Sequence, residues 1–444
     1  MTIKFLGAAG TVTGSSYVLT SASGQSLLVD LGMFQGLPEI EKLNYDRFDF
    51  DCTKLIGAVL THAHLDHCGR LPILVPGGFT GQVWMTQPTA ELVELSLIDS
   101  AKIAKLKDQS VLYNQIQVNQ ILTKFKTVNY QSPVTVGDFV VIFRDAGHIL
   151  GSASLEILVD NQIIVFSGDM GNSPSDLLKP TEMISRGDVV VMESTYGDSL
   201  HPDDIPRDIL KSEINSVESS GGTLLIPAFS LDRTQELLHL IMHLKQDGLV
   251  KNGTPVFLDS PMAVKATNIY MKYPRSFNSH LQTELKTGCP FDFPGLEMTR
   301  KRQDSESIQG RLGPKVIIAG SGMMTGGRII DHAVHYLPRP TTRLLIVGYQ
   351  GEETLGRHLQ TGDKLVDIEG VKIPVEGVVN DTAGMSSHAD QSQLLRWLKA
   401  IKNAKKVFVT HGEDQPRKVL AGKIQSDLSI ADVNLPVLNQ EFVF

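Results

Sequence analysis

Short apolar and β-branched runs, separated by glycine, serine and asparagine, recur through the first part of the chain. Such runs are typical of strands, and we predict strands over 2–7, 15–20, 26–30, 57–61 and 189–193. A helical pattern extends from about Thr89 to Lys126. Two hairpin-like pairs follow, over 133–137 with 139–144 and over 153–159 with 162–167.

After Tyr196 strand-like and helical patterns alternate, which indicates βαβ units and a mainly parallel sheet. The expected strands are 223–227, 255–258 and 315–319, and the expected helices are 204–218, 232–246, 262–272 and 326–336. The polar segment 273–312 supports no assignment. Alternation resumes with a strand over 343–348, a helix over 391–401, a strand over 406–410 and a helix over 415–428. One domain inserted into another explains this order best.

The composition is that of a soluble globular protein, with 41% hydrophobic and 20% charged residues. The 444 residues are enough for two domains. A net charge of −8 argues against binding nucleic acid by bulk positive charge, although it leaves room for a local basic groove. Three cysteines, with no CxxC pair, indicate reduced thiols. The first residues lack a signal-like apolar stretch and no segment is long enough to span a membrane, so we expect a cytoplasmic protein.

The most informative motif is His62-Ala-His64-Leu-Asp66-His67, directly after a predicted strand. In an extended chain the imidazoles of His62 and His64 project the same way, so both can reach one metal ion. Asp66 and His67 begin the next turn and point elsewhere, which suits a second ion nearby. Because one ion takes about three protein ligands, the remaining ligands must come from distant parts of the chain.

Three further candidates lie where predicted strands meet glycine-rich turns. They are Asp30 in Leu-Val-Asp-Leu-Gly, His148 in Asp-Ala-Gly-His-Ile-Leu-Gly-Ser and Asp169 in Phe-Ser-Gly-Asp-Met-Gly. A single residue at such a position more often has a structural role. Three of them in this order around the histidine cluster support one another as candidates for the metal site.

In this order the motifs resemble those of the metallo-β-lactamase superfamily. The resemblance implies an α/β fold, namely an αββα sandwich with metals at one edge. It implies that His62, His64 and His148 bind a first metal, that Asp66 and His67 bind a second, and that Asp169 bridges the two. Asp30 would orient a metal-bound histidine, a role that such ligands commonly need.

Motifs in the second half resemble the β-CASP nucleases within that superfamily. Glu193 in Val-Met-Glu-Ser-Thr-Tyr-Gly, His388 in Gly-Met-Ser-Ser-His-Ala-Asp and His411 in Phe-Val-Thr-His-Gly-Glu are similar to their motifs A, B and C. Two other segments add to the resemblance, Leu-Asp259-Ser-Pro-Met-Ala and Ser321-Gly-Met-Met-Thr-Gly-Gly-Arg. The histidine at motif C is similar to the RNA-acting members. The implied domains are 1–200 and 347–444 for the metallo-β-lactamase part and 201–346 for an inserted parallel-sheet β-CASP domain.

The implied function is a zinc-dependent ribonuclease that cuts single-stranded RNA in processing or decay. His411 would complete the second metal's ligands, and a hydroxide held by the two ions would attack phosphorus. His388, oriented by Glu193, would protonate the departing 3′-oxygen. Asp66, Glu193 and His388 are therefore the candidate catalytic residues, and the expected products carry a 5′-phosphate and a 3′-hydroxyl.

Four residues are weaker candidates for binding substrate. Gly326 and Gly327 open a predicted helix and, with Arg328, could bind a phosphate, but a tight strand-to-helix turn explains them equally well. Ser386 could donate to a phosphate or cap the helix that starts near Asp390. We interpret the apolar stripe of helix 232–246 as core.

Two other functions stay open. A small-molecule hydrolase of the same superfamily, acting on thioesters, esters or lactones, would explain the first metal motifs but would leave Glu193 and His388 without a role. An inactive RNA-binding scaffold conflicts with the intact set of candidate ligands. Mn²⁺ suits the same donors as Zn²⁺, and the sequence leaves open both a homodimer and the choice between endonuclease and exonuclease.

Overall fold

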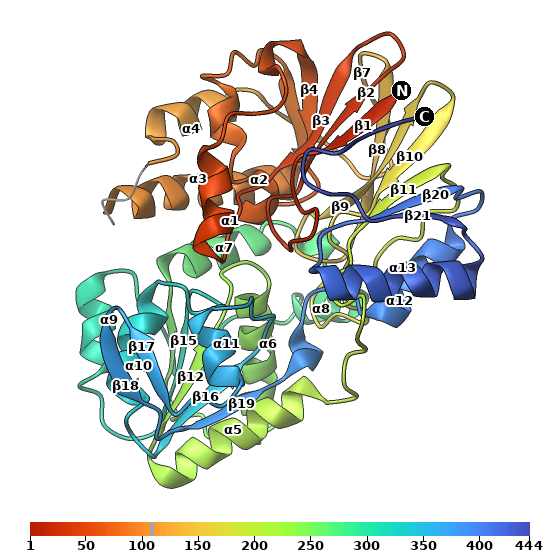
Figure 1. Cartoon of the computed structure of the whole chain (residues 1–444). Helices are drawn as coiled ribbons and strands as arrows, with labels where there is room; N and C mark the ends of the chain where they lie inside the picture. The colour runs from red at the N-terminus through yellow and green to blue at the C-terminus, as the bar shows by residue number, and fades with distance from the viewer. Residues whose placement is uncertain (107–110) are drawn as a thin grey trace. The chain divides into compact units, whose positions relative to one another are not determined.

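The computed structural model describes residues 1–106 and 111–444, which form two compact units (Figure 1). The first unit is Met1–Leu200 with His388–Phe444, and the second is His201–Ser387. The sequence predicts the end of the insertion at residue 346, but the second unit continues to Ser387. It does so because later strands of this segment extend the sheet and the core of the second unit.

Two sheets face each other in the first unit. One has the strand order β22, β1, β2, β3, β4, β5, β6, and the other has the order β21, β20, β11, β10, β9, β8, β7. The strands of the first sheet are β1 (Thr2–Phe5), β2 (Ser16–Thr20), β3 (Ser26–Leu31), β4 (Leu55–Val59), β5 (Gln82–Thr86), β6 (Phe125–Val128) and β22 (Glu441–Val443). Those of the second are β7 (Val134–Val136), β8 (Phe139–Asp145), β9 (Ala153–Val159), β10 (Gln162–Phe166), β11 (Val189–Met192), β20 (Lys406–Val409) and β21 (Asp432–Asn434).

Alternation along the strands separates two hydrophobic layers. Successive side chains of a strand point to opposite faces of the sheet. Ile164 and Phe166 of β10 therefore lie in the core between the two sheets, whereas Val165 lies on the outer face with Trp397 and Leu420. These last two belong to α12 (Gln391–Ala400) and α13 (Asp414–Leu428), which cover the second sheet.

Helices α3 (Gln87–Leu106) and α4 (Gln115–Leu122) belong to the first sheet's side of the sandwich, and α3 contacts β5 and β6 (Figure 1). The short helices α1 (Pro38–Lys42) and α2 (Leu65–Cys68) complete this unit. Helices outside two facing sheets make the αββα sandwich that the resemblance implies, so this prediction is confirmed.

The continuous helix expected over 89–126 is wrong. The side chain of Asn114 accepts hydrogen bonds from the backbone N–H groups of Ile116 and Gln117, and Gln117 bonds back in a capping box that starts a new helix. The chain then enters β6, which pairs with β5. The part of the expected helix over 107–110 lies outside the described residues.

The second unit is built on a sheet with the order β14, β13, β15, β12, β16, β19, in which each pairing is parallel. Its strands are β12 (Thr223–Pro227), β13 (Val256–Asp259), β14 (Leu296–Met298), β15 (Lys315–Ala319), β16 (Thr342–Ile346) and β19 (Val378–Asp381). The hairpin β17 (Leu365–Ile368) with β18 (Val371–Pro374) packs into the same core. The helices are α5 (Pro206–Ser220), α6 (Arg233–Gln246), α7 (Pro261–Tyr270), α8 (Ser279–Glu284), α9 (Arg302–Ile308), α10 (Arg328–Tyr336) and α11 (Leu355–Gln360).

The carboxylate of Asp259 organises the ends of this parallel sheet. It is fully buried and accepts hydrogen bonds from His332 Nε2 at 2.7 Å, Arg328 Nη1 at 2.5 Å and Ser305 Oγ at 2.5 Å, and also from Thr299 Oγ1. Burial alone would raise its pKa, but the hydrogen bonds, that of His332 first, outweigh burial and lower the pKa of Asp259 to about 2.

No helix within the described ranges is long and apolar enough to cross a lipid bilayer.

We expect Asp259→Ala to destabilise the second unit by about 3–5 kcal/mol, because it leaves buried cationic and polar partners unpaired. Chemical denaturation followed by fluorescence and circular dichroism measures this, with exposed Asp203→Ala as the control. A carboxylate with a lowered pKa stabilises the fold above its ordinary pKa and loses this effect as the pH falls toward about 2. A loss below about 1 kcal/mol would show that the cluster contributes little.

Candidate metal centre

The predicted metal ligands come together at one edge of the first unit's sandwich. They follow the ends of four strands: His62 and His64 come after β4, His148 after β8, Asp169 after β10 and His411 after β20. Helix α2 adds Asp66 and His67 directly after the first pair. Loops at strand ends place side chains from distant segments close together, which is why residues 62 and 411 share a site.

His62, His64 and His148 form the first group. The Nδ1 atom of His64 lies 3.2 Å from Nε2 of His62 and 3.2 Å from Nε2 of His148. The Oδ2 atom of Asp169 is 3.4 Å from Nε2 of His62 and 3.7 Å from Nε2 of His148. Metal–nitrogen bonds of about 2.0–2.1 Å in a tetrahedron place neighbouring donors roughly 3.3 Å apart. These four side chains therefore have the spacing of a metal site.

Asp66, His67 and His411 form the second group, on the other side of Asp169. The Oδ1 atom of Asp169 lies 3.2 Å from Nε2 of His67 and 3.6 Å from Nε2 of His411. The Oδ2 atom of Asp66 lies 3.5 Å from the same nitrogen of His411. Asp169 thus presents one oxygen to each group, as a bridging ligand would.

Buried atoms without hydrogen-bond partners show that this donor set fits cations. In the part of the chain that the structure describes, Nε2 of His67, Oδ1 of Asp169 and Nε2 of His411 are such atoms. An unsatisfied buried polar atom is costly, and here the three orphaned atoms converge. A divalent cation with His and Asp ligands would satisfy them together.

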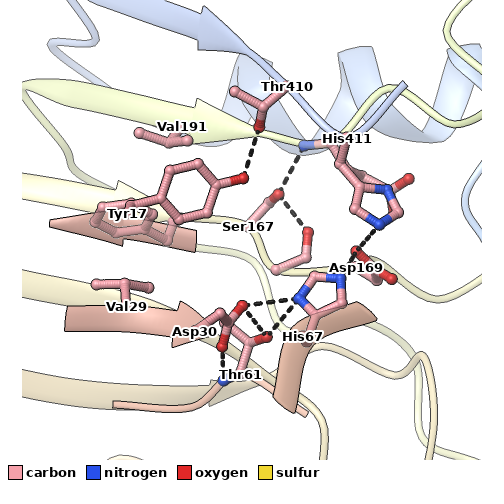
Figure 2. Close-up of a pocket in the computed structure, with 13 residues that line it drawn as sticks. Tyr17, Val29, Asp30, Thr61, His67, Ser167, Asp169, Val191, Thr410 and His411 are labelled. Carbon is pink, nitrogen blue, oxygen red and sulfur yellow. Dashed lines mark hydrogen bonds and ion pairs between the residues drawn. The ribbon is translucent and has the colours of Figure 1, made fainter. Parts of the chain in front are cut away.

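Asp30 fixes the orientation of His67 (Figure 2). Its Oδ2 atom lies 2.8 Å from Nδ1 of His67, and its oxygens also accept from the backbone N–H and the hydroxyl of Thr61 at 2.7 and 2.8 Å. With Nδ1 donating to a carboxylate, Nε2 of His67 keeps its lone pair for a metal. Thr195 plays the same part for His411, since its hydroxyl lies 3.1 Å from Nδ1 of that ring. Sequence reasoning missed Thr195, although it stands two residues after Glu193.

The backbone is held in unusual conformations at this centre. Asp30 has φ 54° and His411 has φ 45°, a left-handed region that residues other than glycine seldom adopt. Gly32 allows the end of β3 to approach the loop of the histidine cluster, because a Cβ there would meet the carbonyl oxygen of Asp66 at 1.6 Å. Such backbone conformations are often found at functional sites.

The electrostatics favour cations near Asp169. Burial alone would raise the pKa of Asp169, but His411, His67 and His62 outweigh it and hold this pKa well below its usual range. Burial lowers the pKa of His64 to about 4 and holds that of His62 well below its usual range, so both rings are neutral near neutral pH and can be ligands. Burial alone would lower the pKa of His67, but Asp169 and Asp30 outweigh burial and raise this pKa, so positive charge is favoured at this ring.

Glu193 and His388 form a pair next to these groups. Nδ1 of His388 lies 3.3 Å from Oε2 and 3.4 Å from Oε1 of Glu193, which follows β11 and is buried. The ring of His388 is 4.6 Å from that of His148, measured between centroids. Burial alone would lower the pKa of His388, but Glu193 and the nearby aspartates raise it to about 9. The pair therefore favours a protonated imidazole.

The weaker substrate-binding candidates lie in the second unit. Arg328 forms an ion pair with the buried carboxylate of Asp259, and its side chain is 20% exposed. Gly327 directly precedes the first residue of α10. Ser386 does not cap α12, because the side chain of Asp390 accepts from the N–H of Gln393 and takes that role. Binding of a phosphate by Ser386, Arg328, Gly326 or Gly327 stays a prediction.

Fold and site together define a metallo-hydrolase whose sandwich is interrupted by an inserted parallel-sheet unit. Family models match three segments of the chain: the metallo-beta-lactamase superfamily over residues 9–220, the Beta-Casp domain over 234–359 and the Zn-dependent metallo-hydrolase RNA specificity domain over 372–436. The chain belongs to the β-CASP family of the metallo-β-lactamase superfamily.

Curated relatives agree with this assignment. The chain is 36% identical to Ribonuclease TTHA0252 of Thermus thermophilus, over 96% of each protein. It is 30% identical to an RNase J-like protein of Methanocaldococcus jannaschii, over 93% of this chain and 92% of that protein. It is 29% identical to Cleavage and polyadenylation specificity factor 73 of Drosophila melanogaster, over 96% of this chain and 62% of that protein. A protein of unknown function from Enterococcus faecalis has a similar fold, with a TM-score of 0.56 and 11% identity over 100% of this chain and 99% of that one.

Asp30→Ala is expected to weaken zinc binding by about 10–100-fold, because His67 loses the carboxylate that orients it and fixes its tautomer. Zinc competition with a chromogenic chelator measures this affinity. Asp427→Ala, an exposed aspartate of α13, is the control and should bind zinc like the unaltered chain. An unchanged affinity in Asp30→Ala would contradict the role assigned to Asp30.

Proposed function

We propose that the chain is a ribonuclease that hydrolyses RNA phosphodiester bonds at a centre of two zinc ions. The observation that carries the proposal is a general-acid pair, Glu193 and His388, beside the convergent His and Asp donors. Hydrolysing a simple ester or lactone does not require such a pair, whereas cutting RNA releases an alkoxide that needs a proton. The names of the relatives and of the RNA specificity domain support RNA as the substrate.

The roles of the residues follow from their positions. His62, His64 and His148 would hold one ion, Asp66, His67 and His411 the other, with Asp169 between them. Two cations held there would make a bound water acidic enough to ionise near neutral pH, and they would neutralise charge on the phosphoryl oxygens. His388 donates its proton to the departing 3′-oxygen, and Glu193 keeps that imidazole oriented and protonated.

Several finer points remain predictions from the sequence. They are a preference for single-stranded RNA, a cytoplasmic location, a homodimer, and Mn²⁺ as an alternative to Zn²⁺. The small-molecule hydrolase is the second candidate function, and the inactive scaffold is the third. Assays of RNA, a thioester and a lactone with the same preparation separate them, because the scaffold binds RNA and turns over none of the three.

We expect His388→Ala to lower kcat for an end-labelled RNA by about 10²–10⁴-fold, the usual contribution of a general acid. Hydrolysis of bis(p-nitrophenyl) phosphate should fall far less, because nitrophenolate leaves without a proton. The variant should keep the zinc content of the unaltered chain. His358→Ala, which changes a half-exposed histidine, is the matched control.

Equal losses of activity on RNA and on the nitrophenyl ester would contradict the acid role and point to a defect in the metal centre. A drop in zinc content would show that His388 is a ligand. Thioester turnover that is unaffected by His388→Ala, with intact RNA left uncut, would favour the second candidate function.

Glu193→Gln is expected to move the alkaline limb of the pH–kcat profile to lower pH. Glu193 contributes most to raising the pKa of His388 above the ordinary value of 6.5, so a neutral amide lets His388 lose its proton at lower pH. Steady-state rates between about pH 6 and 10 measure the shift, with exposed Glu306→Gln as the control. A profile that only decreases in height would mean that Glu193 does not set the protonation of His388.

A further inference from the structure

A second cluster of metal-binding side chains lies in the second unit, between α6 and α8. His239 and His243 are one turn apart on α6, and His280 and Glu284 are one turn apart on α8. Residues at i and i+4 lie on one face of a helix, so each helix presents two donors together. Sequence reasoning assigned the α6 stripe to the core and missed the His-x-x-x-His spacing within it.

The donor atoms of this cluster converge closely. Nε2 of His239 lies 2.7 Å from Oε2 of Glu284 and 3.0 Å from Nε2 of His243. Nε2 of His243 lies 3.0 Å from Oε1 of Glu284, and Nε2 of His280 lies 2.9 Å from the same oxygen. The side chain of His239 is buried, and those of His243 and Glu284 are 25% and 19% exposed.

Hydrogen bonds do not account for all of these contacts. A ring nitrogen carries one hydrogen or one lone pair in its plane. If both Nε2 atoms carry a hydrogen, both can donate to the carboxylate, but the 3.0 Å contact between the two nitrogens then has no acceptor. If either is deprotonated, its lone pair faces a carboxylate oxygen at 2.7 or 3.0 Å. The remaining arrangement protonates Glu284, although a carboxyl group is a stronger acid than an imidazolium ion.

A cation among the three donors removes this conflict, because each nitrogen can then direct a lone pair at it. We propose that His239, His243 and Glu284 bind a structural zinc ion that joins α8 to α6. Two imidazoles and a carboxylate are a donor set that binds zinc, and a water would complete its four ligands. The site belongs to the second unit and uses none of the residues of the centre around Asp169.

His280 is a supporting residue in this proposal. Its side chain is 75% exposed, and its ring stacks on that of His243 with centroids 6.3 Å apart. Its Nε2 lies 2.9 Å from Oε1 of Glu284, and a hydrogen donated there would orient the carboxylate, as partners of metal ligands commonly do. Helix α8 has six residues, and so short a helix depends on contacts outside itself for its stability. A zinc ion would supply such a contact.

Zinc content of the full chain tests the site. Unaltered protein, Glu284→Gln, His243→Gln and the control His335→Gln are dialysed against the same low-zinc buffer, and bound zinc is measured by mass spectrometry. We expect both site variants to hold about one zinc fewer per chain than the unaltered protein and the control. Equal zinc content in all four proteins would overturn the proposal.

Hydrogen exchange gives a measurement on the unaltered chain, which holds even if a variant folds poorly. Adding zinc should slow amide exchange in the peptides that contain α6 and α8, and Glu284→Gln should abolish this effect. Glutamine keeps the size of the side chain and can still donate and accept hydrogen bonds, so a polar cluster without metal would survive the change. Exchange that zinc does not alter in these peptides, or alters equally in Glu284→Gln, would show that no structural ion binds there.

Discussion

The site of the first unit depends on the contacts between the buried carboxylate of Asp169 and the histidines around it. Nitrogens of His62, His67, His148 and His411 surround it at 3.2–3.7 Å. His62, His148 and His411 follow the ends of strands in both sheets, and His67 lies in α2. The carboxylate therefore marks the point where the two halves of the sandwich meet. A buried charge is tolerated only with compensating partners, and the pKa of Asp169, held far below its usual range, shows how strongly its neighbours favour the ionised form.

The need for partners around Asp169 also explains why the C-terminal segment must complete the sandwich. Strand β20 pairs with β11 and delivers His411, while β22 pairs with β1 at the edge of the other sheet. Ligands from residues 62 to 411 therefore converge only after the chain has returned from the insertion. Binding of the ions would couple this late segment to the N-terminal cluster, because such a site does not exist in the unfolded chain.

Most of the sandwich and the main ligand candidates could be predicted from the sequence, for identifiable reasons. The His62–His67 cluster stands directly after an apolar strand, and its spacing is rare enough to indicate metal ligands without further evidence. The capping box at Asn114 was a local signal that the long helical pattern concealed. Thr195 and the partners of Asp259 could not be predicted, since their roles depend on contacts between segments distant in sequence. His239 and His243 carried a readable spacing, but their partner Glu284 lies in a segment without a clear pattern.

The end groups of the cleaved RNA test the central claim most directly. Zinc-loaded protein would be incubated with a defined single-stranded RNA in ¹⁸O-labelled water, and the fragments would be analysed by mass spectrometry. Hydrolysis at the Asp169 centre, with His388 protonating the 3′-oxygen, predicts a 3′-hydroxyl and a 5′-phosphate that contains one ¹⁸O from water. A 2′,3′-cyclic phosphate with a 5′-hydroxyl would contradict the account, because it would make the 2′-hydroxyl of the RNA the nucleophile in place of water.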